Sequence, residues 1–288
     1  MKNTMKLTIV AAAVASVFSI SAQASTMHIG SATGIEASIL DSGNFDTFAL
    51  EGALGLAYKG NEWVNWGTHS SWGWLNANGT SVNTLGADPL GTSNLAGDGT
   101  NFVLTGVFGS GLTFTQTMTR VNNETIGVQV SLTNNTGSDV TGVQWGVGLD
   151  PDVDRNVSLS GYATHNTILG QGAGASVVAE GLLLGGHTLT LENTTSAGAH
   201  NIAAFINGPC CTPVDPTTAF AGAQFVGFNT TADNSISLAY DIGTMHTGDT
   251  KTIGYQYVMA VPEPETYTMF LAGLGLMGFM ARRRSKTS

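Results

Sequence analysis

Basic residues are scarce in this chain, and most of them lie at its two ends. The 288 residues contain ten Lys and Arg against twenty Asp and Glu. Six of the ten basic residues fall in the terminal segments, so the body between them has four basic and eighteen acidic residues, a net charge of about −14. A surface with so little positive charge cannot neutralise phosphates, which argues against nucleic-acid binding. It favours solubility and an affinity for divalent cations.

Cysteine is also nearly absent, and the two that occur, Cys210 and Cys211, are adjacent. Neither has the spacing of a zinc site. Neighbouring Cα atoms are about 3.8 Å apart, below the usual disulfide range, so a bond between them would be strained. In an oxidising compartment three states stay open: a vicinal disulfide, a bond to another chain, or two reduced thiols. We favour the vicinal disulfide, in an irregular loop marked by Pro209, Pro213 and Pro216.

Recognisable catalytic motifs are missing. There is no G-x-S-x-G nucleophile elbow, and the six histidines are scattered without H-x-x-x-H spacing. The letters G-x-G-x-x-G do occur at residues 273–278, but inside an apolar stretch with no preceding strand, so a dinucleotide site is rejected. No two carboxylates stand out as an acid pair for glycoside hydrolysis. We therefore predict no catalytic residues and no certain cofactor, with a secreted polysaccharide-modifying enzyme as the less favoured alternative.

Long helical periodicity is absent outside the two ends, and the body instead alternates apolar and polar residues. Thirty-eight glycines suit short strands joined by tight turns. Alternation of period two predicts antiparallel strands with one buried and one solvated face. It is strongest over residues 126–132, 143–149, 236–240 and 253–257, and weaker over 102–108, 112–121, 176–184, 187–191, 202–206 and 224–228. Residues 25–260 are thus predicted to form an all-β body, an antiparallel β-sandwich of jelly-roll or Greek-key type.

The N-terminus has the features of a secretory signal peptide. Lys2 and Lys6 form a basic region, and residues 7–20 are apolar. Ala22 and Ala24 then provide an A-x-A cleavage site for signal peptidase. We expect residues 1–24 to be removed and the mature chain to begin at Ser25.

The C-terminus has three parts in a fixed order: a proline-containing tetrapeptide, an apolar segment and a basic cluster. Pro262 and Pro264 fix two φ angles and favour an extended, accessible peptide. Residues 267–281 carry no charge, and as a helix they would reach about 22 Å against roughly 30 Å of bilayer hydrocarbon. Arg282, Arg283 and Arg284 would hold the end of this marginal membrane-directed helix in the cytoplasm.

Residues 261–288 resemble the PEP-CTERM sorting signal of Gram-negative bacteria. The resemblance rests on Val261, Pro262, Glu263 and Pro264, on the glycine-containing apolar span, and on the terminal arginines. It implies transient anchoring in the inner membrane and recognition by an exosortase, a membrane-embedded cysteine transpeptidase that removes the tail near the triplet. The product would be released to, or attached at, the cell surface, often within an exopolysaccharide or biofilm matrix.

An acidic loop follows the predicted strand that ends at residue 149. Asp150, Asp152 and Asp154 occupy alternate positions, and such carboxylates can converge on Ca²⁺, which takes six to eight oxygen ligands. The EF-hand pattern fails, because Arg155 stands at its sixth position and Gly161 at its twelfth. We retain a different calcium loop as a hypothesis, beside a simple solvated acidic turn.

Four of the five tryptophans lie within twelve residues. Trp63, Trp66, Trp72 and Trp74 could form an aromatic platform for sugar rings, or they could fill the core of the sandwich. Burial in the core is the favoured interpretation.

These features lead to three hypotheses for the body. The first is a non-catalytic structural or adhesive module of the cell surface or matrix. The second is a carbohydrate-binding module, with calcium as an optional ligand, that contacts extracellular polysaccharide. The third is the polysaccharide-modifying enzyme.

Overall fold

The structure is a computed structural model, and it describes most of the body of the chain. The described residues are 27–40, 42–45, 55–64, 71–84, 92–97, 99–108, 111–153, 155, 161–182, 186–261 and 271–277. The predicted signal peptide, with Ala22 and Ala24, lies outside them.

The described strands form three antiparallel sheets, the largest of which has nine strands. Its order is β16-β12-β13-β14-β18-β10-β9-β8-β7. These strands span Asn229–Ala232 (β16), Thr164–Gly170 (β12), Ser176–Gly181 (β13), Thr188–Asn193 (β14), Thr250–Ala260 (β18), Thr125–Asn134 (β10), Leu112–Arg120 (β9), Asn101–Phe108 (β8) and Thr92–Gly97 (β7).

The two smaller sheets have five and four strands. The five-stranded sheet has the order β15-β17-β11-β5-β6, and the four-stranded sheet has the order β1-β2-β3-β4. Their strands span Asn201–Asn207 (β15), Ser235–Met245 (β17), Val140–Leu149 (β11), Ser71–Ala77 (β5), Thr80–Asn83 (β6), Met27–Gly30 (β1), Ile35–Ile39 (β2), Leu56–Tyr58 (β3) and Asn61–Glu62 (β4). A 3₁₀ turn, η1 (Gly172–Gly174), and a short helix, α1 (Pro216–Ala221), complete the body.

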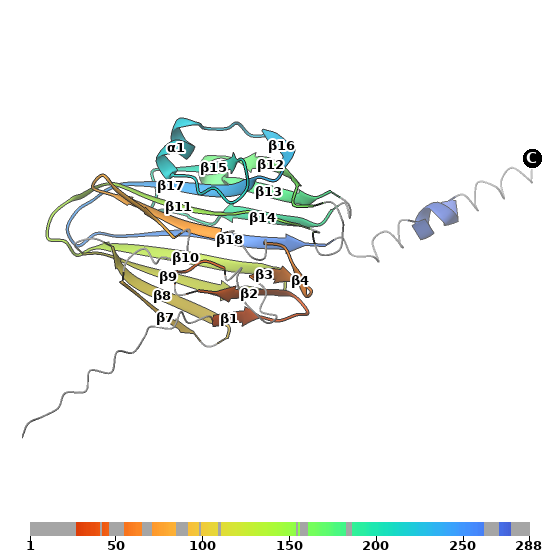
Figure 1. Ribbon diagram of the computed structural model, residues 1–288, viewed down its shortest axis with the longest axis horizontal. Coiled ribbons are helices and arrows are strands. Elements are labelled where there is room, and N and C mark those ends of the chain that lie inside the picture. Colours follow the sequence, from red (N-terminus) through yellow and green to blue (C-terminus); the bar gives the residue numbers. More distant parts are fainter. Residues whose placement is uncertain are drawn as a thin grey trace, which may run out of the picture.

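The sheets are arranged in two layers. The nine-stranded sheet forms one layer; β1 contacts β8 and β9, while β15 and β17 contact β12 and β13 (Figure 1). The smaller sheets are joined to each other by the β-bridge between Val64 and Pro151 and by a 2.9 Å bond from Phe45 N to Ser71 Oγ. Together they form the second layer. The prediction of an antiparallel β-sandwich is confirmed.

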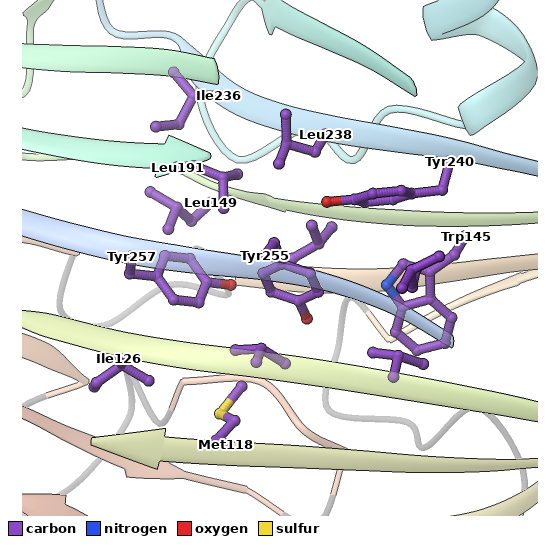
Figure 2. Packing of buried hydrophobic residues seen from close by; sticks show 14 of the residues in the cluster. Met118, Ile126, Trp145, Leu149, Leu191, Ile236, Leu238, Tyr240, Tyr255 and Tyr257 are labelled. Carbon is purple, nitrogen blue, oxygen red and sulfur yellow. The ribbon is translucent and has the colours of Figure 1, made fainter. Parts of the chain in front are cut away.

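The core lies between the two layers and is rich in aromatic side chains. Tyr240 on β17 faces Tyr255 and Tyr257 on β18, and Trp145 on β11 packs against the same group (Figure 2). The Tyr240 hydroxyl donates to the carbonyl of Gly254 at 3.2 Å, so its polar end is satisfied inside the core. In each strongly alternating segment, the side chains that face the core are the apolar ones of the sequence pattern.

The weaker strand predictions are confirmed except for residues 224–228. There Phe228 N bonds back to Phe225 O, and Gly227 has a φ of +90°, so the chain turns and the strand β16 begins only at Asn229. Strand β12, which pairs with β13 and β16, was not predicted, and neither were β1 to β7 or β16. The sequence of β12, THNTILG, is mostly polar and shows no clear alternation.

The outer face of the five-stranded sheet is covered, contrary to the expectation of a solvated face. Helix α1 and the loop before it lie over β11 and β17, where Ala203, Val214, Ala219 and Ala239 form a small second core. The cover is close: a Cβ on Gly146 would lie 3.0 Å from Pro216 Cγ of α1. Beside it, a Cβ on Gly148 would lie 2.5 Å from Ser237 Oγ and 2.6 Å from the Trp72 ring, which belong to the neighbouring strands β17 and β5. Glycine at this position is therefore a packing requirement and not a sign of exposure.

The tight packing around Gly148 predicts that one added methyl group lowers the free energy of unfolding. Gly148→Ala forces Trp72 and Ser237 to move, and overpacking of this kind costs about 1–3 kcal/mol. Urea unfolding followed by circular dichroism would measure the loss. The matched control is Gly127→Ala on β10, where the new Cβ would meet only the exposed Val121 side chain at 3.1 Å. Equal destabilisation by both substitutions would contradict this account of the outer face.

Part of the predicted membrane-directed segment is described. Residues 271–277 form a helix, whereas the remainder of residues 267–281 lies outside the described residues. Among the helices that the structure describes, none has the length and apolar character needed to cross a membrane.

Candidate functional site

The acidic loop after β11 is buried and held in place by backbone contacts. Asp150 continues the outward-facing row of β11 beyond Gly148, and Pro151 bridges to Val64. Asp152 N donates to the carbonyl of Trp63 at 2.8 Å. Asp150 is 1% exposed and Asp152 is 2% exposed, so the prediction of a solvated acidic turn is wrong for both residues.

A third carboxylate joins them from a distant part of the sequence. Asp233 lies between β16 and β17, and carboxylate oxygens of Asp150, Asp152 and Asp233 all lie within 4.8 Å of one another. Asp154, the third ligand proposed from the sequence, lies outside the described residues. Sequence reasoning missed Asp233, because nothing local links the turn before β17 to the end of β11; only the pairing of these two strands does.

The cysteine loop closes the site from outside. Cys211 Sγ donates to Asp150 Oδ2 at 3.2 Å, and Cys211 N donates to Ser235 Oγ at 3.1 Å. Thiol and carboxylate atoms of Cys210, Cys211 and Asp150 form a second group within 4.8 Å, which shares Asp150 with the first. The acidic loop and the cysteine pair, which the sequence analysis treated as separate features, therefore form one cluster.

No disulfide is formed between the two cysteines in this structure, where their Sγ atoms lie 2.6 Å apart. The vicinal disulfide remains a prediction. The sequence correctly indicated an irregular loop, and Cys211 has a φ of +62°, in the left-handed region that side chains disfavour. A bond between adjacent residues would add strain to this backbone.

Several buried polar atoms at the site have no hydrogen-bond partner within the described part of the chain. They include both carboxylate oxygens of Asp152 and one oxygen each of Asp150 and Asp233. Trp72 Nε1 and Ser237 Oγ, which lie against Gly148 on the same face, share this property. Buried polar atoms normally have hydrogen-bond partners. A cluster of buried polar atoms without partners is therefore characteristic of a site that binds an ion or another ligand.

The electrostatics of the cluster disfavour three negative charges. The pKa of Asp152 is raised to about 8, mainly by burial and then by the carboxylates of Asp150 and Asp233, against the lowering effect of Arg155. Burial likewise raises the pKa of Asp150 to about 6, against the lowering effect of the Cys211 thiol. Burial also raises the pKa of Cys211, which keeps this thiol protonated. The Arg155 guanidinium donates to the Tyr162 hydroxyl at 2.8 Å and stacks on that ring.

These shifts predict that the cation-free protein loses stability as pH rises. In the unfolded chain both aspartates titrate near 3.9, so between about pH 4 and pH 8 the folded state binds more protons. The free energy of unfolding therefore falls across this window, by up to about 2.7 kcal/mol per pH unit between about pH 4 and 6, where both groups contribute, and by up to about 1.4 kcal/mol per pH unit above that. Urea unfolding in the presence of a chelator measures it. Asp152→Asn removes the main titrating group, and a slope that this variant leaves unchanged would contradict the assignment.

The tryptophans are placed unequally. Trp63 and Trp72 are each 2% exposed, so they cannot form a sugar platform. Trp63 lies in the core between the layers, whereas Trp72 is buried on the outer face of the five-stranded sheet. Trp74 is half-buried, and its Nε1 donates to Asn76 Oδ1 at 3.0 Å and to Ser81 Oγ at 2.7 Å. Trp66 lies outside the described residues. Trp72 and Trp74 share one face of β5, and that face is the one covered by α1 and its loop.

Replacement of these side chains separates a structural role from a binding role. Trp72→Ala should lower the free energy of unfolding by about 3–5 kcal/mol, because it empties a fully buried site. Trp74→Ala should cost less, because that ring is partly solvated already. Chemical unfolding measures both changes. A stable Trp72→Ala variant that had lost affinity for a polysaccharide would support the platform and contradict burial.

Comparison with known families identifies the tail. Residues 260–284 match the family model of the PEP-CTERM protein-sorting motif. The chain is therefore an exported protein of the class that exosortase processes, with a destination at the cell surface or outside the cell. Pro262, Glu263, Pro264 and Arg282 to Arg284 lie in the matched segment but outside the described residues, whereas Val261 directly follows β18.

The body has distant structural likenesses only. No curated protein matches the chain in sequence. A solved structure described as a polysaccharide lyase is similar over 82% of this chain and 32% of its own, with 14% identity and a TM-score of 0.39. Heparinase III is similar over 82% of this chain and 35% of its own, with 8% identity and a TM-score of 0.43. The chain thus spans about a third of the length of these structures.

Proposed function

We propose that the body is a non-catalytic structural or adhesive module that the sorting tail delivers to the cell surface or the exopolysaccharide matrix. The observation that supports it most is the burial of the chemically capable groups. Asp150 and Asp152 are at most 2% exposed beneath the cysteine loop. A polymeric substrate cannot reach carboxylates in that position, whereas a buried cluster can stabilise a passive module.

The junction between body and tail fits processing without damage to the fold. Strand β18 ends at Ala260 and is paired on both sides, with β10 and with β14. The pairing with β14 runs to Ala260, opposite Thr188, and Met259 N also donates to Glu124 O at 2.9 Å. Removal of the chain beyond Val261 therefore leaves every described strand of the body in place.

Exosortase processing predicts a defined change in mass and location. In cells with exosortase, intact-mass measurement should find a mature protein that begins at Ser25 and has lost Arg282 to Arg284. It should be recovered in the surface or matrix fraction. In cells without exosortase the tail should remain and the protein should stay with the membrane fraction.

Two outcomes would contradict the proposal, and they affect different parts of it. An exported product that retains the terminal arginines in normal cells would contradict sorting. Shortening of the matrix polysaccharide by the purified mature protein, detected as new chain ends, would contradict a non-catalytic body while leaving sorting intact.

A further inference from the structure

We infer that Asp150, Asp152 and Asp233 bind one Ca²⁺ ion that fastens the end of β11 to the connection between β16 and β17. Asp150 and Asp152 come from the five-stranded layer. Asp233 follows β16, an edge strand of the nine-stranded layer, and precedes β17 in the opposite layer. An ion shared by all three would cross-link the two layers of the sandwich at one end.

The spacing of the carboxylates suits a calcium ion. Oxygen atoms of the three residues lie within 4.8 Å of one another. Calcium–oxygen distances are about 2.3–2.6 Å, so two ligands on opposite sides of the ion are roughly 4.6–5.2 Å apart. The cluster therefore has the size of a single coordination sphere without any large movement of the backbone.

The unpartnered oxygens are the second, independent indication of a ligand. Asp152 is 98% buried, and neither of its oxygens has a hydrogen-bond partner among the described residues. Asp150 keeps one oxygen without a partner, because only its Oδ2 accepts from Cys211. Burial of carboxylates without partners costs several kcal/mol unless a cation or a proton compensates. Exported proteins meet calcium in the concentration range that extracellular modules bind, about 10⁻⁴–10⁻³ M.

The donor set favours calcium over other divalent metals. Three carboxylates are hard oxygen ligands, and backbone carbonyls nearby can complete a flexible shell of six to eight oxygens. Magnesium needs a near-ideal octahedron and keeps most of its waters. Zinc prefers thiolate and imidazole, whereas Cys211 Sγ lies 3.2 Å from Asp150 Oδ2 as a hydrogen-bond donor to that carboxylate. The cysteine loop is the cover of the site and supplies no ligand.

Calorimetric titration and thermal melts of the purified full chain test this site. Both are carried out with reductant, so that the thiols stay reduced. Addition of 10 mM Ca²⁺ to the chelator-treated protein should raise Tm by about 3–10 °C. Asp233→Asn should weaken calcium binding by about tenfold or more, and in chelator it should melt at or above the temperature of the unmodified protein, because it removes a buried like charge. Asp139→Asn is the control, since it removes the same charge from an exposed residue paired with His246.

Replacement of the two cysteines should leave calcium binding intact, in contrast to replacement of Asp233. Cys210→Ser/Cys211→Ser should retain the calcium response, because serine keeps a donor for Asp150 and no ligand is lost. The proposal is overturned if calcium shifts neither the heat signal nor Tm, or if Asp233→Asn binds calcium as tightly as the control. It is also overturned if Zn²⁺ gives the larger stabilisation and the double serine variant abolishes it. None of these outcomes bears on exosortase processing, which depends on the tail.

Discussion

Covering one face of the five-stranded sheet is the constraint on which the rest of this structure depends. The segment from Gly208 to α1 lies on β11, β17 and β5, and its Cys211 contacts Asp150, a carboxylate that is out of water. The gain is apolar burial around Val214 and Ala219. The cost is carboxylates in a medium that disfavours their charge. A sandwich with a solvated outer face would have neither the second core nor the electrostatic problem.

Several devices keep this cover in register. Asp215 caps α1 through its bond to Thr217 N at 2.8 Å and also accepts from Asn76 on β5 at 2.9 Å. Cys211 N is held by Ser235 Oγ at the start of β17. The loop is thus attached to β5 and to β17, the two strands that flank β11 in the sheet. These attachments place Cys211 over Asp150.

The sequence predicted the layers of this fold better than its surfaces. Alternation over Ile126, Val130 and Leu132 identified the inner row of β10 correctly, because burial between two sheets selects apolar residues at every second position. The same rule failed for Gly146 and Gly148, since glycine on an outward row signals close cover as readily as exposure. The polar strand β12 was missed because edge-region strands lack the apolar row that makes alternation visible.

Only part of the candidate site could be predicted from the sequence. Asp150 and Asp152 are close in sequence, so their spacing alone suggested a shared cation. Asp233 and the cysteines reach them only through the antiparallel pairing of β11 with β17, which begins at Leu149 and Ile236. Spacing along the chain predicts which residues are neighbours within one loop. Contacts made by strand pairing can be predicted only when the order of the strands in the sheet is known.

The place of β18 in the nine-stranded sheet has a consequence for biogenesis. It is the last of the described strands, yet it fills the gap between β14 and β10, so the sheet is two separate halves until residues 250–260 arrive. The sheet therefore closes only once the residues directly before the sorting tail have been made. The segment that joins its two halves is the one next to the region where the tail would be cut.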